Sequence, residues 1–416
     1  MRFTISEVLP MSDALSAAQL PALRLKRNED RRLNAGHLWI FSNEVDTQQT
    51  ALNKFKPGDW ARVLAHNDRA LGLAYVNPQS LICARLLSTW SMPNTAWLAA
   101  RMRIALGLRE RLYAKPYYRL IFGESDGLPG LIVDRYGATV VVQIGTAGME
   151  RLKSQIQEAL IEVVRCEAVL YKNDGSAREL EGLPSYVETG YGRIGDLVQV
   201  DEDGLKFQVP LAAGQKTGWF FDQAANRRAL PQYMARGARV LDVFSYVGAW
   251  GVRALQAGAR EVLCVDSSAA ALELAAGNAA ANSGTHGNKL QTVKGDAFDV
   301  LEELGLKGER FDVVVIDPPA FAKRRKDLPK AVAAYKRLNQ LAMQLIGDGI
   351  LVSCSCSFHV SAEDLQDAIA KAARSAQKHL QILQMGGQAA DHPVHPAIPE
   401  TRYLKAYFCR VSDGLK

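Results

Sequence analysis

The sequence predicts an α/β protein whose C-terminal half forms a doubly wound parallel sheet, preceded by a small β-barrel and a central α+β region. Three observations predict this fold. Short strand-like runs fill residues 22–93, strand and helix patterns mix in residues 94–210, and strands alternate with helical patterns in residues 211–416. Such alternation is typical of βαβ units in a parallel sheet, whereas closely spaced short strands are typical of a barrel.

Length and composition agree with several globular domains. The chain has 416 residues, of which 48% are hydrophobic and 23% charged, enough for roughly two to four domains. No apolar run approaches the ~20 residues that would cross a bilayer. Residues 1–21 lack a continuous apolar core, so we expect a disordered lead-in and no secretory signal. Six cysteines without a CxxC pair favour a reduced, cytoplasmic protein without a metal site.

The first predicted unit, residues 22–93, contains short strands joined by turns. Trp60–Ala65 and Ala70–Tyr75 flank the turn-forming residues 66–69, and Leu81–Leu86 follows. Strands at this spacing predict a small β-barrel.

Basic residues are in excess near the N-terminus. The net charge is +6, from 50 basic and 44 acidic residues, and a basic cluster that includes Arg24, Lys26 and Arg27 begins the first unit. This excess permits a polyanion such as RNA as partner. An ordinary solvated surface explains the charge equally well.

The central unit, residues 94–210, mixes helices with hairpins. Apolar residues recur every three or four positions from Asn94 to Ala114, which predicts a helix with Asn94 as its N-cap. The other elements expected here are strands Leu131–Asp134 and Thr139–Ile144, a helix at 148–164, a strand at 168–172 and a hairpin around Asp201–Gly204.

The last unit, residues 211–416, alternates strands with helical patterns, which predicts a parallel sheet. The expected strands are Arg239–Val243, Glu261–Asp266, Lys289–Lys294, Phe311–Asp317 and Gly349–Cys354. Two further runs, Leu380–Met385 and Leu404–Val411, are close enough to pair antiparallel.

The first of these strands leads into a cofactor loop that contains Asp242, Phe244, Ser245 and Gly248. Glycine at a strand-to-helix turn lets a ligand approach the backbone. Because Tyr246 stands where the fingerprint G-x-G-x-x-G has its first glycine, the loop favours a nucleoside ligand over a pyrophosphate.

An acidic residue ends the next strand, and another lies two residues beyond the strand after that. Asp266 could accept hydrogen bonds from ribose hydroxyls, and Asp296, followed by Ala297, could accept from an adenine amino group. Either acid alone could simply cap a helix. Phe220 and Gln223 precede the sheet, and we expect them to pack against the cofactor, although core packing is a rival explanation.

The fourth and fifth strands carry the residues expected to catalyse a reaction. Asp317 is followed by two prolines, which make a stiff turn without backbone donors. Strand alternation places Cys354 and Cys356 on one face, with Cys356 nearer the carboxyl edge. We expect Cys356 to be a nucleophile and Cys354 a small buried hydrophobe.

A thiol here would suit methyl transfer to a cytosine. Thiolate addition at C6 makes C5 able to attack a methyl sulfonium, and Asp317 could offset charge at N3 and O2. A base must then remove the C5 proton. His359 and His392 are candidates, although an ordinary polar loop residue explains each of them.

These residues resemble a family, the bacterial 23S ribosomal RNA cytosine-5 methyltransferases with an N-terminal PUA domain. The resemblance extends from about Leu23 to Val411. The matching motifs are 33–42, 123–130, 216–223, Phe244-Ser245-Tyr246-x-Gly248, Asp317-Pro318-Pro319, Ser355-Cys356-Ser357 and 390–394. The resemblance implies a PUA-like barrel, a Rossmann-like class I methyltransferase sheet, S-adenosyl-L-methionine as methyl donor, 23S ribosomal RNA as substrate and a nucleophile at Cys356.

A second basic run, Lys323, Arg324, Arg325 and Lys326, follows the Asp-Pro-Pro turn. We expect it to contact RNA phosphates, although a solvated helix entry is the simpler explanation. The protein could also form an oligomer such as a homodimer, and we expect no membrane contact.

Three alternatives remain. The first is methyl transfer to a guanine or adenine nitrogen, which needs no cysteine. Such enzymes usually carry an aromatic residue directly after the two prolines, where this chain has Ala320. The second is a non-catalytic RNA-binding ribosome assembly factor. The third, a nicotinamide dehydrogenase, is disfavoured by the missing glycine.

Overall fold

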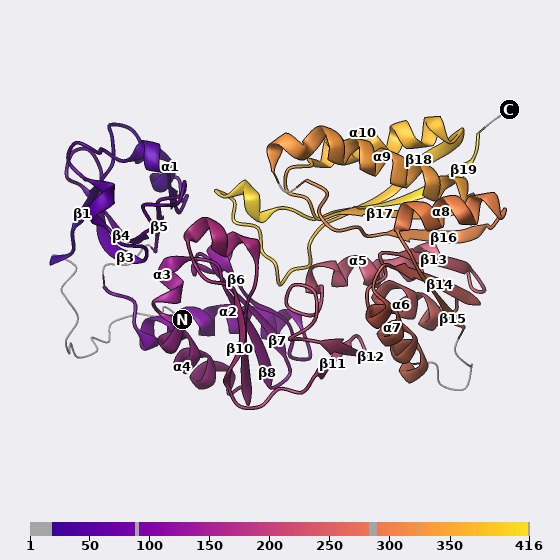
Figure 1. Cartoon of the computed structure of the whole chain (residues 1–416), viewed down its shortest axis with the longest axis horizontal. Helices are drawn as coiled ribbons and strands as arrows, with labels where there is room; N and C mark the ends of the chain where they lie inside the picture. Colours follow the sequence, from indigo (N-terminus) through magenta and orange to yellow (C-terminus); the bar gives the residue numbers. More distant parts are fainter. Residues whose placement is uncertain (1–18, 88–90, 283–288, 323, 415–416) are drawn as a thin grey trace, which may run out of the picture.

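The structure is a computed structural model that describes residues 19–87, 91–282, 289–322 and 324–414 (Figure 1). The predicted lead-in, residues 1–21, lies outside this description except for its last three residues. Two of these are fixed by Arg62, whose Nε donates to the Leu20 carbonyl at 3.2 Å and whose backbone N–H donates to the Pro21 carbonyl at 2.9 Å.

The N-terminal unit is a five-stranded sheet with the order β1-β3-β4-β5-β2. Its elements are β1 (Ala22–Arg24), α1 (Arg31–Asn34), β2 (Trp39–Ile40), β3 (Asp59–Leu64), β4 (Ala70–Val76) and β5 (Ala84–Leu86). The predicted β3–β4 hairpin is confirmed, with Asp59 opposite Val76. Strand β5 starts later than expected, because residues 77–83 form a turn that Asn77 closes by donating its N–H to the Cys83 carbonyl.

The central unit is a second five-stranded sheet, ordered β10-β9-β8-β7-β6. Its elements are α2 (Thr95–Leu112), β6 (Tyr117–Phe122), β7 (Leu131–Tyr136), β8 (Thr139–Ile144), α3 (Ala147–Glu150), α4 (Lys153–Val164), β9 (Ala168–Asn173) and β10 (Tyr186–Tyr191). Asn94 caps α2 as predicted, since its side chain accepts from the Trp97 N–H at 2.9 Å. The single helix expected at 148–164 is wrong: Arg151 and Leu152 separate α3 from α4.

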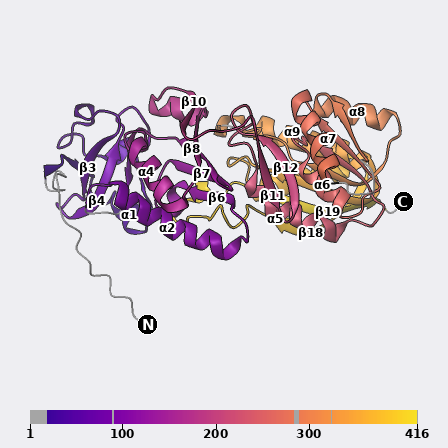
Figure 2. The same ribbon diagram turned by 90° about the horizontal axis from the view of Figure 1, so that it is seen from below.

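The hairpin of β11 (Leu197–Glu202) and β12 (Leu205–Pro210) connects this unit to the last one. Its position around Asp201–Gly204 confirms the prediction. Figure 2 shows the units in a row, from the N-terminal sheet to the C-terminal one.

The C-terminal unit is a seven-stranded sheet with the order β15-β14-β13-β16-β17-β19-β18. Its strands are β13 (Arg239–Val243), β14 (Glu261–Asp266), β15 (Leu290–Lys294), β16 (Phe311–Ile316), β17 (Ile346–Ser355), β18 (Lys378–Gly386) and β19 (Lys405–Asp413). The first five are parallel, and β19 pairs antiparallel with both β17 and β18. The predicted parallel sheet and its antiparallel final pair are both confirmed.

Two hydrophobic cores lie on the two faces of this sheet. The helices of the unit are α5 (Ala224–Ala229), α6 (Ala249–Gln256), α7 (Ala269–Asn282), α8 (Ala297–Leu306), α9 (Leu328–Gln344) and α10 (Ala362–Ser375). Helices α6 and α7 pack together, as do α9 with α8 and α10. Within the described ranges, no helix has the length and apolarity that a bilayer crossing needs.

The connection between β18 and β19, residues 387–404, leaves the sheet and reaches back to the central unit (Figure 1). We call it the bridging segment. Its Asp391 is buried: Oδ2 accepts from the Arg119 N–H at 2.8 Å, and the carbonyl accepts from Arg109 Nη2 at 2.9 Å. The central and C-terminal units are therefore joined by buried polar contacts.

Candidate functional site

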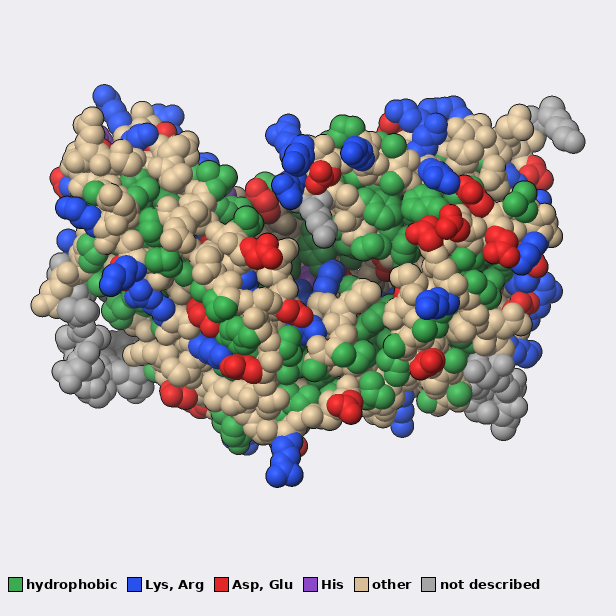
Figure 3. Space-filling model, viewed as in Figure 1, with side chains coloured by type: hydrophobic (Ala, Val, Ile, Leu, Met, Phe, Trp, Pro, Cys, Tyr) green, Lys and Arg blue, Asp and Glu red, His purple; other side chains and the backbone are tan. Residues whose placement is uncertain are grey.

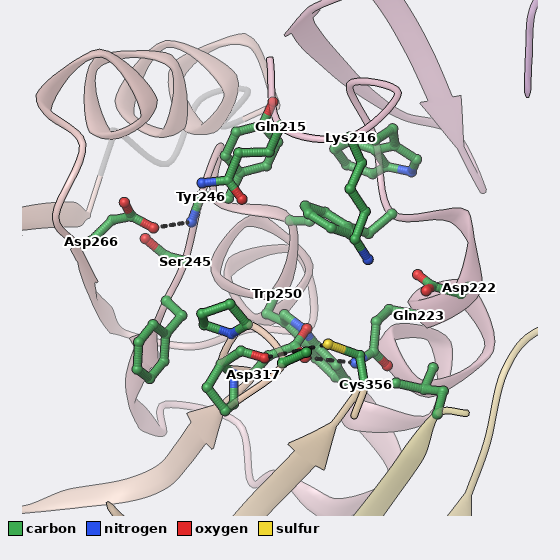
Figure 4. A pocket seen from close by; sticks show the side chains of 18 of the residues that line it. Gln215, Lys216, Asp222, Gln223, Ser245, Tyr246, Trp250, Asp266, Asp317 and Cys356 are labelled. Carbon is green, nitrogen blue, oxygen red and sulfur yellow. Dashed lines mark hydrogen bonds between the residues drawn. The ribbon is translucent and has the colours of Figure 1, made fainter. Parts of the chain in front are cut away.

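A cavity of about 420 Å³ opens at the carboxyl ends of the parallel strands (Figure 4). It lies where the strand order reverses between β13 and β16, the place where open α/β sheets bind ligands. The lining includes the predicted site residues Phe220, Gln223, Phe244, Ser245, Asp266, Asp317 and Cys356. Figure 3 shows this face of the molecule hollowed between the N-terminal units and the seven-stranded sheet.

The loop after β13 has an unusual backbone. Phe244 and Tyr246 have φ angles of 64° and 49°, in the left-handed region that non-glycine residues seldom adopt. Gly248 has φ 80°, and a Cβ there would lie 2.9 Å from the Ala275 Cβ, so this position requires glycine. Backbone of this kind costs on the order of 1–3 kcal/mol per residue and concentrates at ligand sites.

Asp266 fixes that loop from the end of β14. Its Oδ2 accepts from the Tyr246 N–H and its Oδ1 from the Ser268 N–H, both at 2.9 Å. Since a carboxylate has about four lone-pair sites, acceptor capacity remains for ribose hydroxyls. The Ser245 side chain is buried and lines the cavity, so its hydroxyl can bind a polar ligand.

Asp317 stands at the end of β16 between two neutral donors. Gln223 Nε2 donates to Oδ1 at 2.8 Å, and Trp250 Nε1 donates to Oδ2 at 3.1 Å. Asn226 orients Gln223 by donating to its Oε1 at 2.7 Å. Burial raises the pKa of Asp317, and these hydrogen bonds only partly oppose that rise. The side chain is thus fixed in place, and it holds a proton more readily than an exposed carboxyl does.

Cys356 lines the cavity beside Asp317, while Cys354 lies fully buried in the core. The Cys356 Sγ lies 3.8 Å from the Pro318 carbonyl oxygen. Burial raises the pKa of its thiol and Lys216 lowers it, whereas Asp317 raises it further. The predicted burial of Cys354 is confirmed, whereas the nucleophilic role of Cys356 stays a prediction.

Asp222 and Tyr403 are among the lining residues that were not predicted as site residues from the sequence. The Tyr403 hydroxyl donates to Asp222 Oδ2 at 2.5 Å. Burial opposes ionisation of Asp222, but Lys216, His392, the Tyr403 hydroxyl and Arg119 together lower its pKa to about 2. Asp222 stands between Phe220 and Gln223, which were both predicted to contact the cofactor. This position in the sequence was the feature from which Asp222 could have been predicted as a lining residue.

Four predicted cofactor residues lie outside the cavity lining: Asp242, Gly248, Asp296 and Ala297. Asp242 is buried beneath the loop, where Oδ2 accepts from the Gly251 N–H at 2.9 Å. Burial raises the pKa of Asp242 to about 7, and Asp317 and Asp266 add to the rise. Asp296 caps α8 by accepting from the Phe298 N–H at 2.9 Å, and Ala297 is buried at the start of that helix. Their cofactor contacts stay predictions.

The predicted histidine bases lie outside the lining too. His392 belongs to the bridging segment, where its Nδ1 lies 2.8 Å from Asp391 Oδ1 and its ring 5.1 Å from the Phe122 ring. His359 follows β17 at an intermediate depth.

The N-terminal basic residues lie on the first sheet and its following turn. Arg24 pairs with Asp68, Lys26 Nζ donates to the Asn43 carbonyl at 2.8 Å, and Arg27 is exposed. None of these contacts tests RNA binding.

The second basic run precedes α9. Lys323 lies outside the described residues, while Arg324, Arg325 and Lys326 are exposed. The run follows the Asp-Pro-Pro turn by a few residues, so it is near the cavity along the chain. Its contact with RNA stays a prediction.

Two family models match the chain. A PUA-like domain matches residues 23–89, and an S-adenosylmethionine-dependent methyltransferase matches residues 184–408. Fold and site therefore define an S-adenosylmethionine-dependent methyltransferase with an N-terminal PUA-like domain, and S-adenosylmethionine is its cofactor.

Several curated proteins are similar over nearly the whole length. "Ribosomal RNA large subunit methyltransferase I" of Erwinia tasmaniensis is 36% identical over 94% of this chain and 99% of its own. The protein of that name from Klebsiella pneumoniae is 36% identical over 96% of this chain and all of its own. The chain belongs to the family of these relatives.

Solved structures support the fold. A protein proposed to be a methyltransferase, complexed with SAH, superimposes with a TM-score of 0.81 at 21% identity, over 94% of this chain and all of its own. A chain from Streptococcus mutans gives a TM-score of 0.78 at the same identity and coverage. Both agree with the α/β architecture described above.

Proposed function

We propose that the protein transfers a methyl group from S-adenosylmethionine to C5 of a cytosine in large-subunit (23S) ribosomal RNA, through a covalent bond between Cys356 and C6. The substrate comes from the relatives' name, which is ribosomal RNA large subunit methyltransferase I. The observation that carries the chemistry is that the Cys356 thiol lines the same cavity as Asp317 and Asp266.

Cys356 would act first. Its thiolate adds to C6 of the cytosine, and the electrons move to C5 and to the N3–O2 side of the ring. When bound, S-adenosylmethionine supplies the electrophilic methyl group that C5 takes. A base then removes the C5 proton, and the returning electrons break the bond between C6 and Cys356.

Asp317 would contact the same ring. Its pKa is raised by burial, so it can hold a proton more readily than an exposed carboxyl. Protonated, it donates a hydrogen bond to the side of the ring where negative charge develops. Gln223 and Trp250 fix its orientation before the RNA binds.

RNA would be held by charge outside the cavity. Arg24, Lys26 and Arg27 on the N-terminal unit and the run 323–326 are the proposed phosphate contacts. Figure 3 shows Lys and Arg side chains on the upper rim of the hollow. Phosphate contacts orient a substrate without recognising its sequence. An RNA-modifying role places the protein in the cytoplasm.

The test is mass mapping of ribosomal RNA from a deletion strain and from its parent. We expect one cytidine of the large-subunit RNA to lose a methyl group, and the parent nucleoside to be 5-methylcytidine. Complementation with the wild-type gene restores the modification, and complementation with Cys356→Ala does not. A missing methyl on a nitrogen would contradict the proposal and support the nitrogen-directed alternative.

A further inference from the structure

Asp222 is a buried carboxylate with unused acceptor capacity beside the proposed nucleophile. Its side chain lines the cavity and the residue is 5% exposed. Tyr403 Oη donates to Oδ2, while Oδ1 has no hydrogen-bond partner among the described residues. Since buried polar atoms are nearly always paired, this carboxylate lacks a donor that a ligand could provide.

The surroundings of Asp222 keep it ionised. Burial raises its pKa, but Lys216, His392, the Tyr403 hydroxyl and Arg119 outweigh that effect. An ionised carboxylate accepts hydrogen bonds and donates none. The group that completes the site must therefore present N–H or O–H.

The position of Asp222 indicates which ligand this is. In Figure 4, Asp266 lies on one side of Cys356 and Asp222 on the other. Asp266 is the residue predicted to bind the ribose of the cofactor, so the Asp222 side is left for the target base. Ala320 also lines the cavity, and its side chain fills less of it than an aromatic residue at that position would.

We propose that Asp222 accepts a hydrogen bond from the exocyclic amino group of the target base and thereby selects cytosine over uracil. This inference rests on the proposed function. Cytosine presents an N4 amino donor where uracil presents an O4 acceptor, and carboxylates are suited to accept from cytosine N4. A uracil O4 would face the carboxylate as a second acceptor, which disfavours its binding. Tyr403 is a positioning residue that fixes Asp222.

The test compares three bases at the position that mass mapping identifies. Synthetic RNA fragments carry cytosine, uracil or 2-pyrimidinone, which lacks any group at C4. For the wild type we expect kcat/KM to fall at least about tenfold from cytosine to 2-pyrimidinone, as for loss of a charge-assisted hydrogen bond. Asp222→Ala should make the two nearly equal, because only the wild type has the acceptor.

Two further variants keep the shape of the site. Asp222→Asn can donate from its amide to uracil O4, so it should reduce the preference for cytosine over uracil. Tyr403→Phe should weaken the preference partially. Tyr233→Phe is the matched control, since Tyr233 Oη pairs with Gln384 Oε1 at 2.6 Å outside the cavity lining, and it should leave the preference unchanged.

The amino group that binds Asp222 could belong to S-adenosylmethionine instead of the target base. Calorimetric measurement of S-adenosylmethionine affinity distinguishes these two cases. Asp222→Ala with weaker cofactor binding and full base preference would show that Asp222 binds the amino group of the donor, which overturns the inference. If all Asp222 variants keep the wild-type preference for cytosine and still form 5-methylcytosine, the inference is overturned but the proposed function is not. A wild-type product methylated on nitrogen removes the proposed function and this inference together.

Discussion

Buried carboxylates in the central unit and in the cavity have opposite kinds of partner. In the central unit, Arg109 binds Asp126 through two hydrogen bonds of 2.7 Å, and Arg119 binds Asp134 through two of 2.8 Å. In the cavity, neutral groups hold Asp317, and beneath it one backbone N–H holds Asp242.

This difference indicates that the carboxylates of the central unit stabilise the fold, whereas those at the cavity take part in the reaction. A fork of two charged hydrogen bonds fixes both the position and the charge of a carboxylate. At Asp317 and Asp242 the neutral donors fix the position of the carboxyl, and burial raises its pKa. Asp222 differs, because nearby cationic groups lower its pKa. Raised pKa values of this kind occur where a group must exchange protons. Changes in the central unit should therefore affect stability, and changes in the cavity should affect turnover.

The largest effect is expected at Cys356. Cys356→Ala should bind cofactor and RNA but lose turnover by at least roughly a thousandfold, which is ~4 kcal/mol of barrier. RNA with 5-fluorocytosine at the target should trap the wild type covalently, because fluorine cannot leave as a proton does. Cys354→Ala is the control and should lose only ~1 kcal/mol of stability. A dead Cys354→Ala beside an active Cys356→Ala would show the nucleophile to be misassigned.

The next effect concerns stability and the central unit. Arg119→Met leaves the Asp134 carboxylate buried and unpaired, so urea denaturation should show a loss of about 3 kcal/mol. Arg228→Met removes an exposed ion pair with Asp203 and should lose less than about 1 kcal/mol. Equal losses of unfolding free energy in both variants would contradict the expected difference between buried and exposed ion pairs.

Cofactor affinity should depend on Asp266. Asp266→Ala removes the acceptor for the ribose hydroxyls and also releases the Tyr246 N–H. A loss of about 2 kcal/mol in calorimetric S-adenosylmethionine affinity is expected. Unchanged affinity would remove Asp266 from the cofactor site.

The raised pKa of Asp242 gives a pH dependence of stability. Its folded value of about 7 exceeds the reference value of 3.8, so between these values the folded chain holds a proton that the unfolded chain has lost. The contribution of this group is full below pH 4 and is lost as the pH rises through 7, by about 1 kcal/mol per pH unit. Asp242→Asn should flatten the unfolding free energy between pH 5 and 7, and an unaltered slope would contradict the assignment.

The smallest effect is expected at the basic run. Changing residues 323–326 to glutamine should reduce the slope of log K for RNA against log salt by roughly one for each phosphate contact. Cofactor affinity should stay the same. Lys307→Gln with Lys371→Gln, two surface lysines in helical ion pairs, is the control. An unaltered slope would identify the run as ordinary solvated surface.

The fold of the C-terminal unit was largely predictable because its strands are buried. The bounds of β13 and β14 match the prediction, since central parallel strands consist mainly of apolar residues, and β14 ends in Asp266. Strand β10 was missed, because it is an edge strand with mostly exposed residues and no apolar alternation. Strand β6 was also missed: it follows α2 closely, although the turn-rich residues 123–130 mark its end.

The site was predictable where it follows strands. Cys356 and Asp317 could be placed because parallel strands bring their carboxyl ends to one edge. Tyr403 could not, because the bridging segment that carries it returns from the central unit, and no local pattern encodes that path. For Asp296 the sequence left two roles open, a helix cap and a ligand contact. In the structure its side chain caps α8 by accepting from backbone N–H groups of the first turn.

The bridging segment also determines the order in which the chain can be completed during synthesis. Arg119 and Asp391 are 272 residues apart, which a ribosome adding ~5–20 residues per second covers in roughly 15–50 s. Throughout that interval the Arg119 N–H and the Arg109 guanidinium of the central unit lack the hydrogen bonds that they later donate to Asp391. A nascent or truncated chain that stops before residue 391 therefore lacks part of the interior of a unit whose own strands were finished 200 residues earlier.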